Sequence, residues 1–202
     1  MPPKIAILGW GSLLWEGGAE FDRWHDEWRQ DGPLLMLEFS RVSSRRLDAL
    51  TLVIDREHGV PNKVAWCLSR RPDPDDVIAD LRCREDTTLK NIGHILLTQL
   101  GGKEPHDQPA RDIAVWAKDH ELDAVVWTKL GSNFLSRTKR PFSVSEAVAH
   151  LKKLSTAGKV KAAEYIWRAP EFISTPLRSA VQKEPWFVEK AAHDSERTGQ
   201  RS

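Results

Sequence analysis

Two glycines one residue apart lie near the start of the chain, in the segment of residues 9–13. The apolar run before Gly9 predicts a buried strand, so this segment is expected to be a tight loop where the strand ends. Glycine has no Cβ, and the main-chain N–H groups around Gly11 and Ser12 can therefore converge on an approaching ligand. Such a loop suits the carboxylate of a small molecule, although a simple strand-ending turn explains the same glycines equally well.

The segment does not fit the glycine motifs that bind nucleotides or carry a serine nucleophile. A dinucleotide-binding loop would need a third glycine where the chain has Leu14, and no Gly-Lys-Ser or Gly-Lys-Thr follows. Ser12 has Trp10 two residues before it and Leu14 two residues after it, where a nucleophile elbow needs glycines. We therefore interpret residues 9–13 as a ligand-binding loop that Trp10 and Trp15 flank as aromatic walls.

Glu85 is the second candidate, and it lies at the end of a predicted helix. A carboxylate placed there can accept a proton and return it, as a general base and acid does. Taken alone, Glu85 is more simply explained as a solvated charge that pairs with Arg82 or Lys90. Glu16, which follows the loop, is a weaker second carboxylate, and we expect it on the solvated surface.

Other residue types that could do chemistry form no recognisable site. Seven histidines are scattered without an i,i+4 pair or a His-Glu-x-x-His motif, so no metal site is predicted. Cys67 and Cys83 have no CxxC spacing and are interpreted as reduced packing residues. Lys and Arg number 30 against 29 Asp and Glu, which gives no basic field for nucleic acid. The first apolar run is too short for a signal peptide or a membrane span, so we expect a cytoplasmic protein.

The elements that must position these residues are early strands and later helices. Apolar and β-branched runs predict strands at residues 4–8, 34–39, 49–54, 63–68 and 123–128, with a hairpin joining the third and fourth. Helical periodicity and capping residues predict helices at residues 20–29, from 74 to about 85, 107–121, 143–154 and 159–168, with 88–100 helical or mixed. This order favours an α+β fold with a mixed sheet curved around a pocket.

The length of 202 residues fits one ordinary domain, which we place at residues 1–189. Residues 190–202 are polar and lack periodicity, so this tail is expected to be mobile.

Two motifs in this order resemble the γ-glutamylcyclotransferase-like superfamily. They are Ile-Leu-Gly-Trp-Gly-Ser-Leu-Leu-Trp near the start and Leu-Arg-Cys-Arg-Glu-Asp-Thr further along. That family has a strand followed by Tyr-Gly-Ser and a later helix-end Glu, often preceded by Arg. Residues 39–44, 126–128 and 165–170 resemble a bacterial subgroup, so the resemblance covers most of residues 4–180. One position departs from the pattern: the family tyrosine is Trp10 here, which keeps an aromatic ring and loses a hydroxyl.

The resemblance implies a barrel-like sheet with surrounding helices and an enzyme of the lyase or acyltransferase type that needs no cofactor or metal. The α-amine of a γ-glutamyl compound attacks its own γ-carbonyl, giving 5-oxoproline and a free amine. Glu85 is implied as the general acid and base. The implied substrate-binding residues are Gly9, Trp10, Gly11, Ser12 and Leu13. The implied partner is a small molecule with a free α-amino acid head, with no nucleic acid or membrane.

Two other functions remain open at this point. The fold could serve a non-catalytic protein that binds a small molecule or regulates, because a fold does not determine a function. The same Glu could instead activate water and hydrolyse a γ-glutamyl amide, which would release glutamate in place of 5-oxoproline. The sequence leaves open the leaving amine and the oligomeric state.

Overall fold

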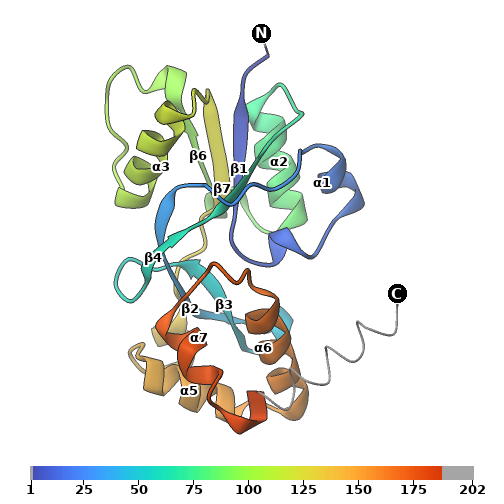
Figure 1. Cartoon of the computed structure of the whole chain (residues 1–202), viewed down its shortest axis with the longest axis vertical. Coiled ribbons are helices and arrows are strands. Elements are labelled where there is room, and N and C mark those ends of the chain that lie inside the picture. Colours follow the sequence, from blue (N-terminus) through green and yellow to red (C-terminus); the bar gives the residue numbers. More distant parts are fainter. Residues whose placement is uncertain (1, 188–202) are drawn as a thin grey trace. The chain divides into compact units, whose positions relative to one another are not determined.

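The structure is a computed structural model that describes residues 2–187, and it contains two compact units (Figure 1). Of the described residues, 2–35 and 61–130 belong to the first unit, and 36–60 and 131–187 belong to the second. Each unit is thus assembled from two separate stretches of chain. A single domain over residues 1–189 stays a prediction, and the predicted tail of residues 190–202 lies outside the described residues.

The first unit contains a four-stranded mixed sheet with the strand order β5-β1-β7-β6. β1 (Ile5–Gly9) pairs in parallel with β7 (Ala124–Thr128) and antiparallel with β5 (Ala65–Leu68). β7 pairs antiparallel with β6 (Ile92–Leu96). All five residues of β1 are buried, because this strand lies inside the sheet, as its continuous apolar run predicts.

Helices cover this sheet and bury its apolar side chains. α1 (Ala19–Arg23) and α2 (Pro74–Arg84) pack against one face, in a core that includes Ile5 and Ile7 of β1. α3 (Gln108–Asp119) lies on the other side of the sheet in Figure 1. Aspartates cap the starts of α2 and α3, since Asp73 accepts a hydrogen bond from the Asp75 N–H and Asp107 accepts one from the Ala110 N–H. Short 3₁₀ turns lie at Ser12–Leu14, Leu89–Asn91 and Leu97–Gln99.

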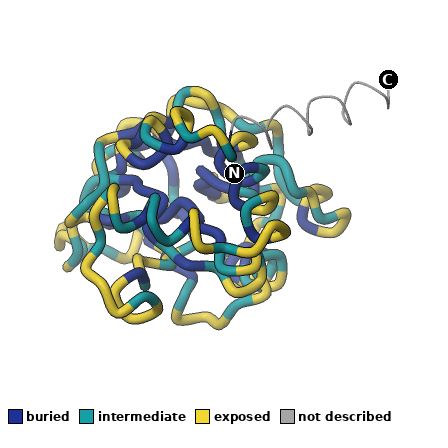
Figure 2. The backbone as a smooth tube through the Cα atoms, turned by 90° about the horizontal axis from the view of Figure 1, so that it is seen from below, coloured by how far each residue is buried: buried dark blue, intermediate teal, exposed yellow. Residues whose placement is uncertain are grey.

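The second unit is built around antiparallel strands that helices cover. Its strands are β3 (Ala49–Ile54) and most of β2 (Leu34–Ser43). The second sheet has the order β3-β2-β4, and residues 61–63 of β4 (Val60–Lys63) belong to the first unit. The helices are α4 (Phe134–Thr138), α5 (Val144–Lys153), α6 (Thr156–Arg168) and α7 (Pro176–Val181), with a 3₁₀ turn at Ser44–Arg46. Buried residues are dark blue in Figure 2, and they include all of β1 and five of the six residues of β3. Arg178 joins the chain around α7 by donating to the carbonyl groups of Ala169, Pro170 and Ile173.

The α+β class predicted from the sequence is confirmed, and the barrel-like closure is wrong for the described residues. Their strands form two open sheets instead. Residues 63–68 were expected to be one strand, but Val64 separates β4 from β5, and the Val64 N–H donates to the Pro33 carbonyl. The two halves of this run therefore join different sheets. The predicted hairpin is also wrong, because β2 lies between β3 and β4 and β5 belongs to the other sheet.

Candidate functional site

The glycine loop is a tight turn directly after β1. Gly11 precedes the 3₁₀ turn with φ of −122° and ψ of −145°, so it does not use the left-handed region. The Leu14 N–H donates to the Gly11 carbonyl at 3.0 Å, and the Trp15 and Glu16 N–H groups donate to the Ser12 carbonyl. The loop is thus fixed by hydrogen bonds that run from its second half back to its first.

The first half of the loop keeps main-chain donors that could receive a ligand. Within the described residues, the N–H groups of Gly11, Ser12 and Leu13 have no hydrogen-bond partner. Donors at the start of a helical turn have no acceptor inside that turn. These three N–H groups can donate to a carboxylate oxygen, and a carboxylate is the ligand that the sequence predicted for this loop.

Packing explains part of the glycine pattern without a ligand. A Cβ on Gly9 would lie 2.9 Å from Leu14 Cδ2 and 3.0 Å from Trp28 Cζ3, so Gly9 allows these side chains to pack against the strand end. Trp10 is only 6% exposed and Leu13 is 7% exposed. The side chain of Trp10 therefore belongs mainly to the protein interior, while the backbone of Gly11, Ser12 and Leu13 carries the donors.

Glu85 ends α2 in a defined main-chain geometry. The Thr87 N–H donates to the Arg82 carbonyl and the Asp86 N–H to the Cys83 carbonyl, and Asp86 has φ of +45°. This is the Schellman arrangement, in which a left-handed residue stops the helix. It fixes the backbone at Glu85, whose side chain is 19% exposed and therefore largely enclosed by the protein.

Arg84 connects Glu85 to the glycine loop. Its Nη1 lies 3.6 Å from Glu85 Oε1, and its Nη2 donates to the carbonyl oxygens of Ser12, at 3.2 Å, and of Glu16. Because one planar guanidinium group makes these contacts, the Glu85 carboxylate lies within about 10 Å of the Ser12 carbonyl oxygen. The two candidate motifs are therefore neighbours in the first unit. Arg84 was not among the site residues predicted from the sequence, although an arginine directly before the helix-end Glu was a visible signal.

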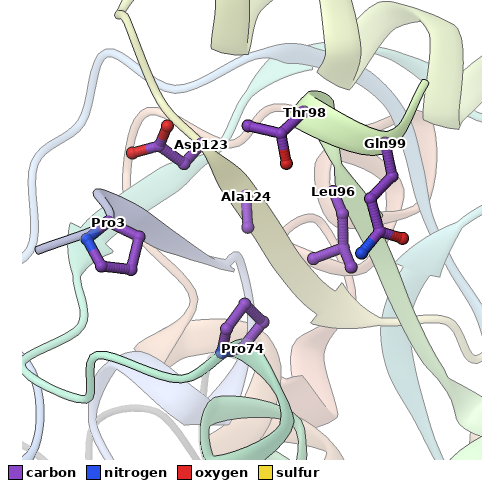
Figure 3. Close-up of a pocket in the computed structure, with 7 residues that line it drawn as sticks. All are labelled: Pro3, Pro74, Leu96, Thr98, Gln99, Asp123 and Ala124. Atoms are coloured by element: carbon purple, nitrogen blue, oxygen red, sulfur yellow. The ribbon is translucent and has the colours of Figure 1, made fainter. Parts of the chain in front are cut away.

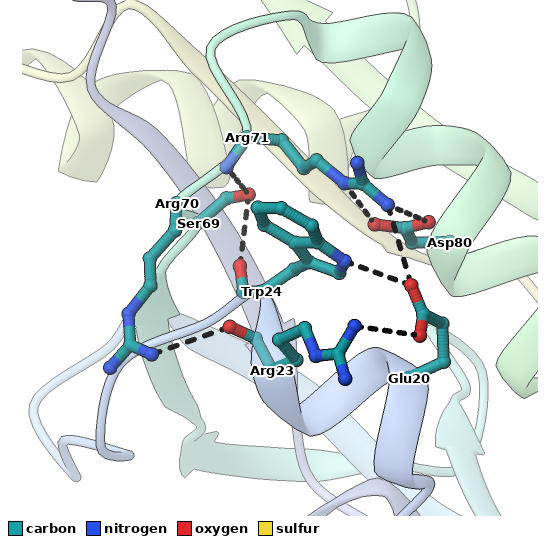
Figure 4. A network of polar contacts seen from close by, with 7 residues as sticks. All are labelled: Glu20, Arg23, Trp24, Ser69, Arg70, Arg71 and Asp80. Carbon is teal, nitrogen blue, oxygen red and sulfur yellow. Dashed lines mark hydrogen bonds and ion pairs between the residues drawn. The ribbon is translucent and has the colours of Figure 1, made fainter.

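A network of polar and aromatic contacts supports the helices beside the loop (Figure 4). Arg71 stacks on the Trp24 ring at 3.8 Å and donates to Asp80 of α2 at 2.9 Å. The Trp24 indole N–H donates to Glu20 of α1 at 3.0 Å, and Arg71 also lies 3.9 Å from Glu20. α1, which follows the loop in sequence, is thereby fastened to α2, which carries Glu85.

A pocket in the same unit lies away from these candidates (Figure 3). It has a volume of about 250 Å³ and is lined by Pro3, Pro74, Leu96, Thr98, Gln99, Asp123 and Ala124. Pro74 begins α2, whereas Glu85 follows its last residue, so the helix separates the pocket from Glu85. The carboxylate of Asp123 already accepts the Lys4 N–H at 2.8 Å. None of the predicted site residues lines this pocket.

The described part of the chain also bears on the remaining sequence predictions. Among residues 2–187, no group of three or more His, Cys, Asp or Glu side chains could hold a metal ion. Cys67 and Cys83 are both free thiols, and burial raises the pKa of Cys67. Cys83 is exposed, so its interpretation as a packing residue is wrong. No helix within the described residues has the length and apolar character needed to cross a membrane.

Comparisons with known proteins add no relative. No protein-family model matches the chain, and neither the curated proteins nor the solved structures give a match.

Proposed function

We propose that this chain is a cytoplasmic, cofactor-independent γ-glutamylcyclotransferase-like enzyme, similar to a bacterial subgroup of that superfamily. It would convert a γ-glutamyl amine or peptide to 5-oxoproline and a free amine. The observation that supports the proposal is the contact of Arg84 with both the glycine loop and Glu85. A small substrate held by the loop could then be reached by the Glu85 carboxylate.

The loop would act by binding one end of the substrate. The α-carboxylate would accept hydrogen bonds from the N–H groups of Gly11, Ser12 and Leu13, which have no partner within the described residues. This contact would hold the substrate folded, with its α-amine close to its γ-carbonyl carbon. Intramolecular positioning of this kind can contribute on the order of 7 kcal/mol to lowering the barrier.

Glu85 would carry protons from the attacking nitrogen to the leaving nitrogen. Its carboxylate first takes a proton from the substrate's α-ammonium, and the free amine then attacks the γ-carbonyl carbon. The new C–N bond closes the five-membered ring. As the bond to the leaving amine breaks, the protonated Glu85 returns the proton to the departing nitrogen. The ring nitrogen still carries one extra proton, which the regenerated Glu85 carboxylate passes to the released amine, so that the amine leaves as an ammonium ion. Atoms and charge then balance without a water molecule, a metal or a covalent enzyme intermediate.

The test is an assay of the purified protein with a panel of γ-glutamyl peptides and amines. We expect 5-oxoproline and the free amine in equal amounts. Release of glutamate in place of 5-oxoproline would show a γ-glutamyl amide hydrolase. Saturable binding without either product would show a non-catalytic binding or regulatory protein, and both results would overturn the proposed reaction.

A further inference from the structure

Arg84 has an unusual position for an arginine at a helix end. It is the last residue of α2, and its side chain is only 13% exposed. A cation at a helix C-terminus usually interacts with the last carbonyl groups of its own helix. The Arg84 guanidinium instead reaches the carbonyl groups of Ser12 and Glu16, which are 72 and 68 residues away in sequence.

Arg84 binds carbonyl oxygens of the loop, whereas a ligand would bind the loop's N–H groups. The Ser12 carbonyl and the Leu13 N–H belong to one peptide group. A cation that binds the carbonyl fixes the plane of that group and polarises it, which makes the N–H a stronger donor. Ser12 also accepts from the N–H groups of Trp15 and Glu16. The orientation of this peptide is thus set by three donors, of which only Arg84 carries a charge.

The same guanidinium group lies beside the candidate acid and base. Nη1 is 3.6 Å from Glu85 Oε1, while Nη2 holds the loop. Arginine suits this arrangement because its rigid, planar group presents several donors in fixed directions. Lysine has a single nitrogen on a flexible chain and cannot hold the two carbonyl groups and the carboxylate in the same way.

The hydrogen bonding of Arg84 is incomplete, which argues against a purely structural role. Its Nε is buried and has no hydrogen-bond partner within the described residues. A buried donor without a partner lowers stability. If Arg84 served only stability, a side chain without this buried donor would make the folded protein more stable.

We propose that Arg84 is the positioning residue of this site: it fixes the peptide groups of residues 12–16 and holds the Glu85 carboxylate toward the loop. The proposal rests on the proposed function for its kinetic consequences, and its structural consequence can be measured without any substrate. Arg84 contacts main-chain carbonyl groups and Glu85, and we assign it no contact with the reacting atoms.

The test compares Arg84→Met with Arg82→Met. Both variants remove one positive charge from the last turn of α2, but Arg82 contacts the Cys83 sulfur instead of the loop. We expect kcat/KM of Arg84→Met to fall about 10-fold to 100-fold, since a small misplacement of reacting groups can cost that much. Arg82→Met should stay within a few-fold of the wild type. The backbone N–H resonances of Gly11, Ser12 and Leu13 should shift in Arg84→Met and not in Arg82→Met.

A third variant, Arg84→Lys, separates positioning from charge. It should keep the melting temperature and still lose most of kcat, because one nitrogen cannot replace the planar group. If Arg84→Met does not fold, Arg84→Lys is judged by the same kinetic and resonance measurements. Wild-type resonances for residues 11–13, or wild-type kcat and KM, in the folded Arg84 variant would overturn the proposal.

The two proposals fail in different ways. A wild-type protein that forms no 5-oxoproline, combined with shifted loop resonances in Arg84→Met alone, would reject the reaction and support the positioning of the loop. An active wild-type protein with an unaffected Arg84→Met variant would support the reaction and reject the role of Arg84.

Discussion

In the proposed reaction Glu85 transfers the protons, which requires a carboxylate oxygen that can accept a proton from the substrate. Glu85→Gln keeps the shape of the side chain but replaces the oxygen that would accept the substrate proton. We expect turnover to fall by about two to four orders of magnitude, which is the usual contribution of a general acid and base. The measurement is the rate of 5-oxoproline formation with the best substrate of the panel, together with a thermal melt.

The matched control is Glu16→Gln, the other carboxylate near the loop. It should change turnover by no more than a few-fold, because Arg84 binds the Glu16 main-chain carbonyl. Near-wild-type turnover in Glu85→Gln would remove the proton-transfer role from Glu85. Loss of folding in the same variant would show that the Glu85 carboxylate is needed for the structure.

A change at Gly11 is expected to weaken substrate binding, whereas a change at Glu85 is expected to lower turnover. The valine side chain of Gly11→Val would lie next to the free N–H groups of the loop and crowd a bound carboxylate. Gly11 has a negative φ, so the variant requires no left-handed backbone at this position. We expect KM to rise at least tenfold with a smaller change in kcat. A variant in which kcat falls and KM is unchanged would contradict the placement of the carboxylate on this loop.

At the scale of elements, the sequence predicted correctly the helices and strands whose formation depends on residues within the same segment. The predicted helices at 107–121 and 159–168 correspond to α3 and α6, and the Ser143 side chain caps α5 through the Glu146 N–H as its motif predicts. The buried strand before the glycine loop corresponds to β1, and the run at 123–128 corresponds to β7. In these segments, residue propensity, capping and apolar period agree with one another.

The elements predicted wrongly are those that distant partners determine. A helix was expected over residues 20–29, but α1 ends at Arg23. The following residues run beside β5, since the Asp26 N–H donates to the Leu68 carbonyl and the Arg29 N–H to the Trp66 carbonyl. Pairing with a strand further along the chain overrides the helical spacing of Phe21, Trp24 and Trp28, and no local pattern contains that information.

The segment 88–100 shows the same effect around a single glycine. Gly93 weakened the helical prediction, and it lies within β6, opposite Trp127 of β7. A Cβ at Gly93 would approach the Trp127 ring to 2.3 Å, so the glycine provides the space that the ring occupies. The reason for this glycine is a side chain 34 positions away, which explains why the sequence alone gave a mixed prediction.

This packing gives a prediction for stability. Gly93→Ala should lower the free energy of unfolding by about 1–3 kcal/mol, because the added methyl group overlaps a buried ring that is held in place. Urea unfolding of the variant measures the effect. In a Trp127→Leu background, where the ring is absent, Gly93→Ala should cost less unfolding free energy than it does in the wild type. Equal costs of Gly93→Ala in both backgrounds would show that the ring is not the cause.

At the scale of the whole molecule, the second unit shows what local patterns cannot reveal. Glu38 lies in an apolar strand where alternation would place it in solvent, yet it is 0% exposed. The pairing of β2 with β3 is irregular between Glu38 and Arg41, which breaks the alternation of faces. The Glu38 carboxylate accepts the N–H groups of Phe39 and of Leu177, which is 139 residues away. The sequence gives no sign of this long-range contact.

Glu38 also gives a prediction for the pH dependence of stability. Burial raises its pKa above the ordinary glutamate value, and the nearby Asp55 adds to the effect, while hydrogen bonds from Thr175 and two main-chain N–H groups oppose it. The folded protein therefore holds the Glu38 proton to a higher pH than the unfolded chain does. The stabilisation from protonated Glu38 is complete below the ordinary value, about 4.3, and is lost as pH rises through the folded-state pKa.

Comparison with Glu38→Gln isolates this contribution from other carboxylates. Hydrogen bonding to Trp66 lowers the pKa of Asp31, for example, and this group gives the opposite trend, since its contribution is lost as pH falls. Asp31 and the other groups are present in both proteins, so their effects cancel in the difference. We expect the unfolding free energy of the wild type minus that of Glu38→Gln to decrease between pH 4 and pH 8, with a slope of at most about 1.4 kcal/mol per pH unit. Urea unfolding of both proteins across this range provides the measurement. A difference that rises with pH would mean that the hydrogen bonds from Phe39, Leu177 and Thr175 outweigh burial, so that Glu38 is ionised in the folded protein.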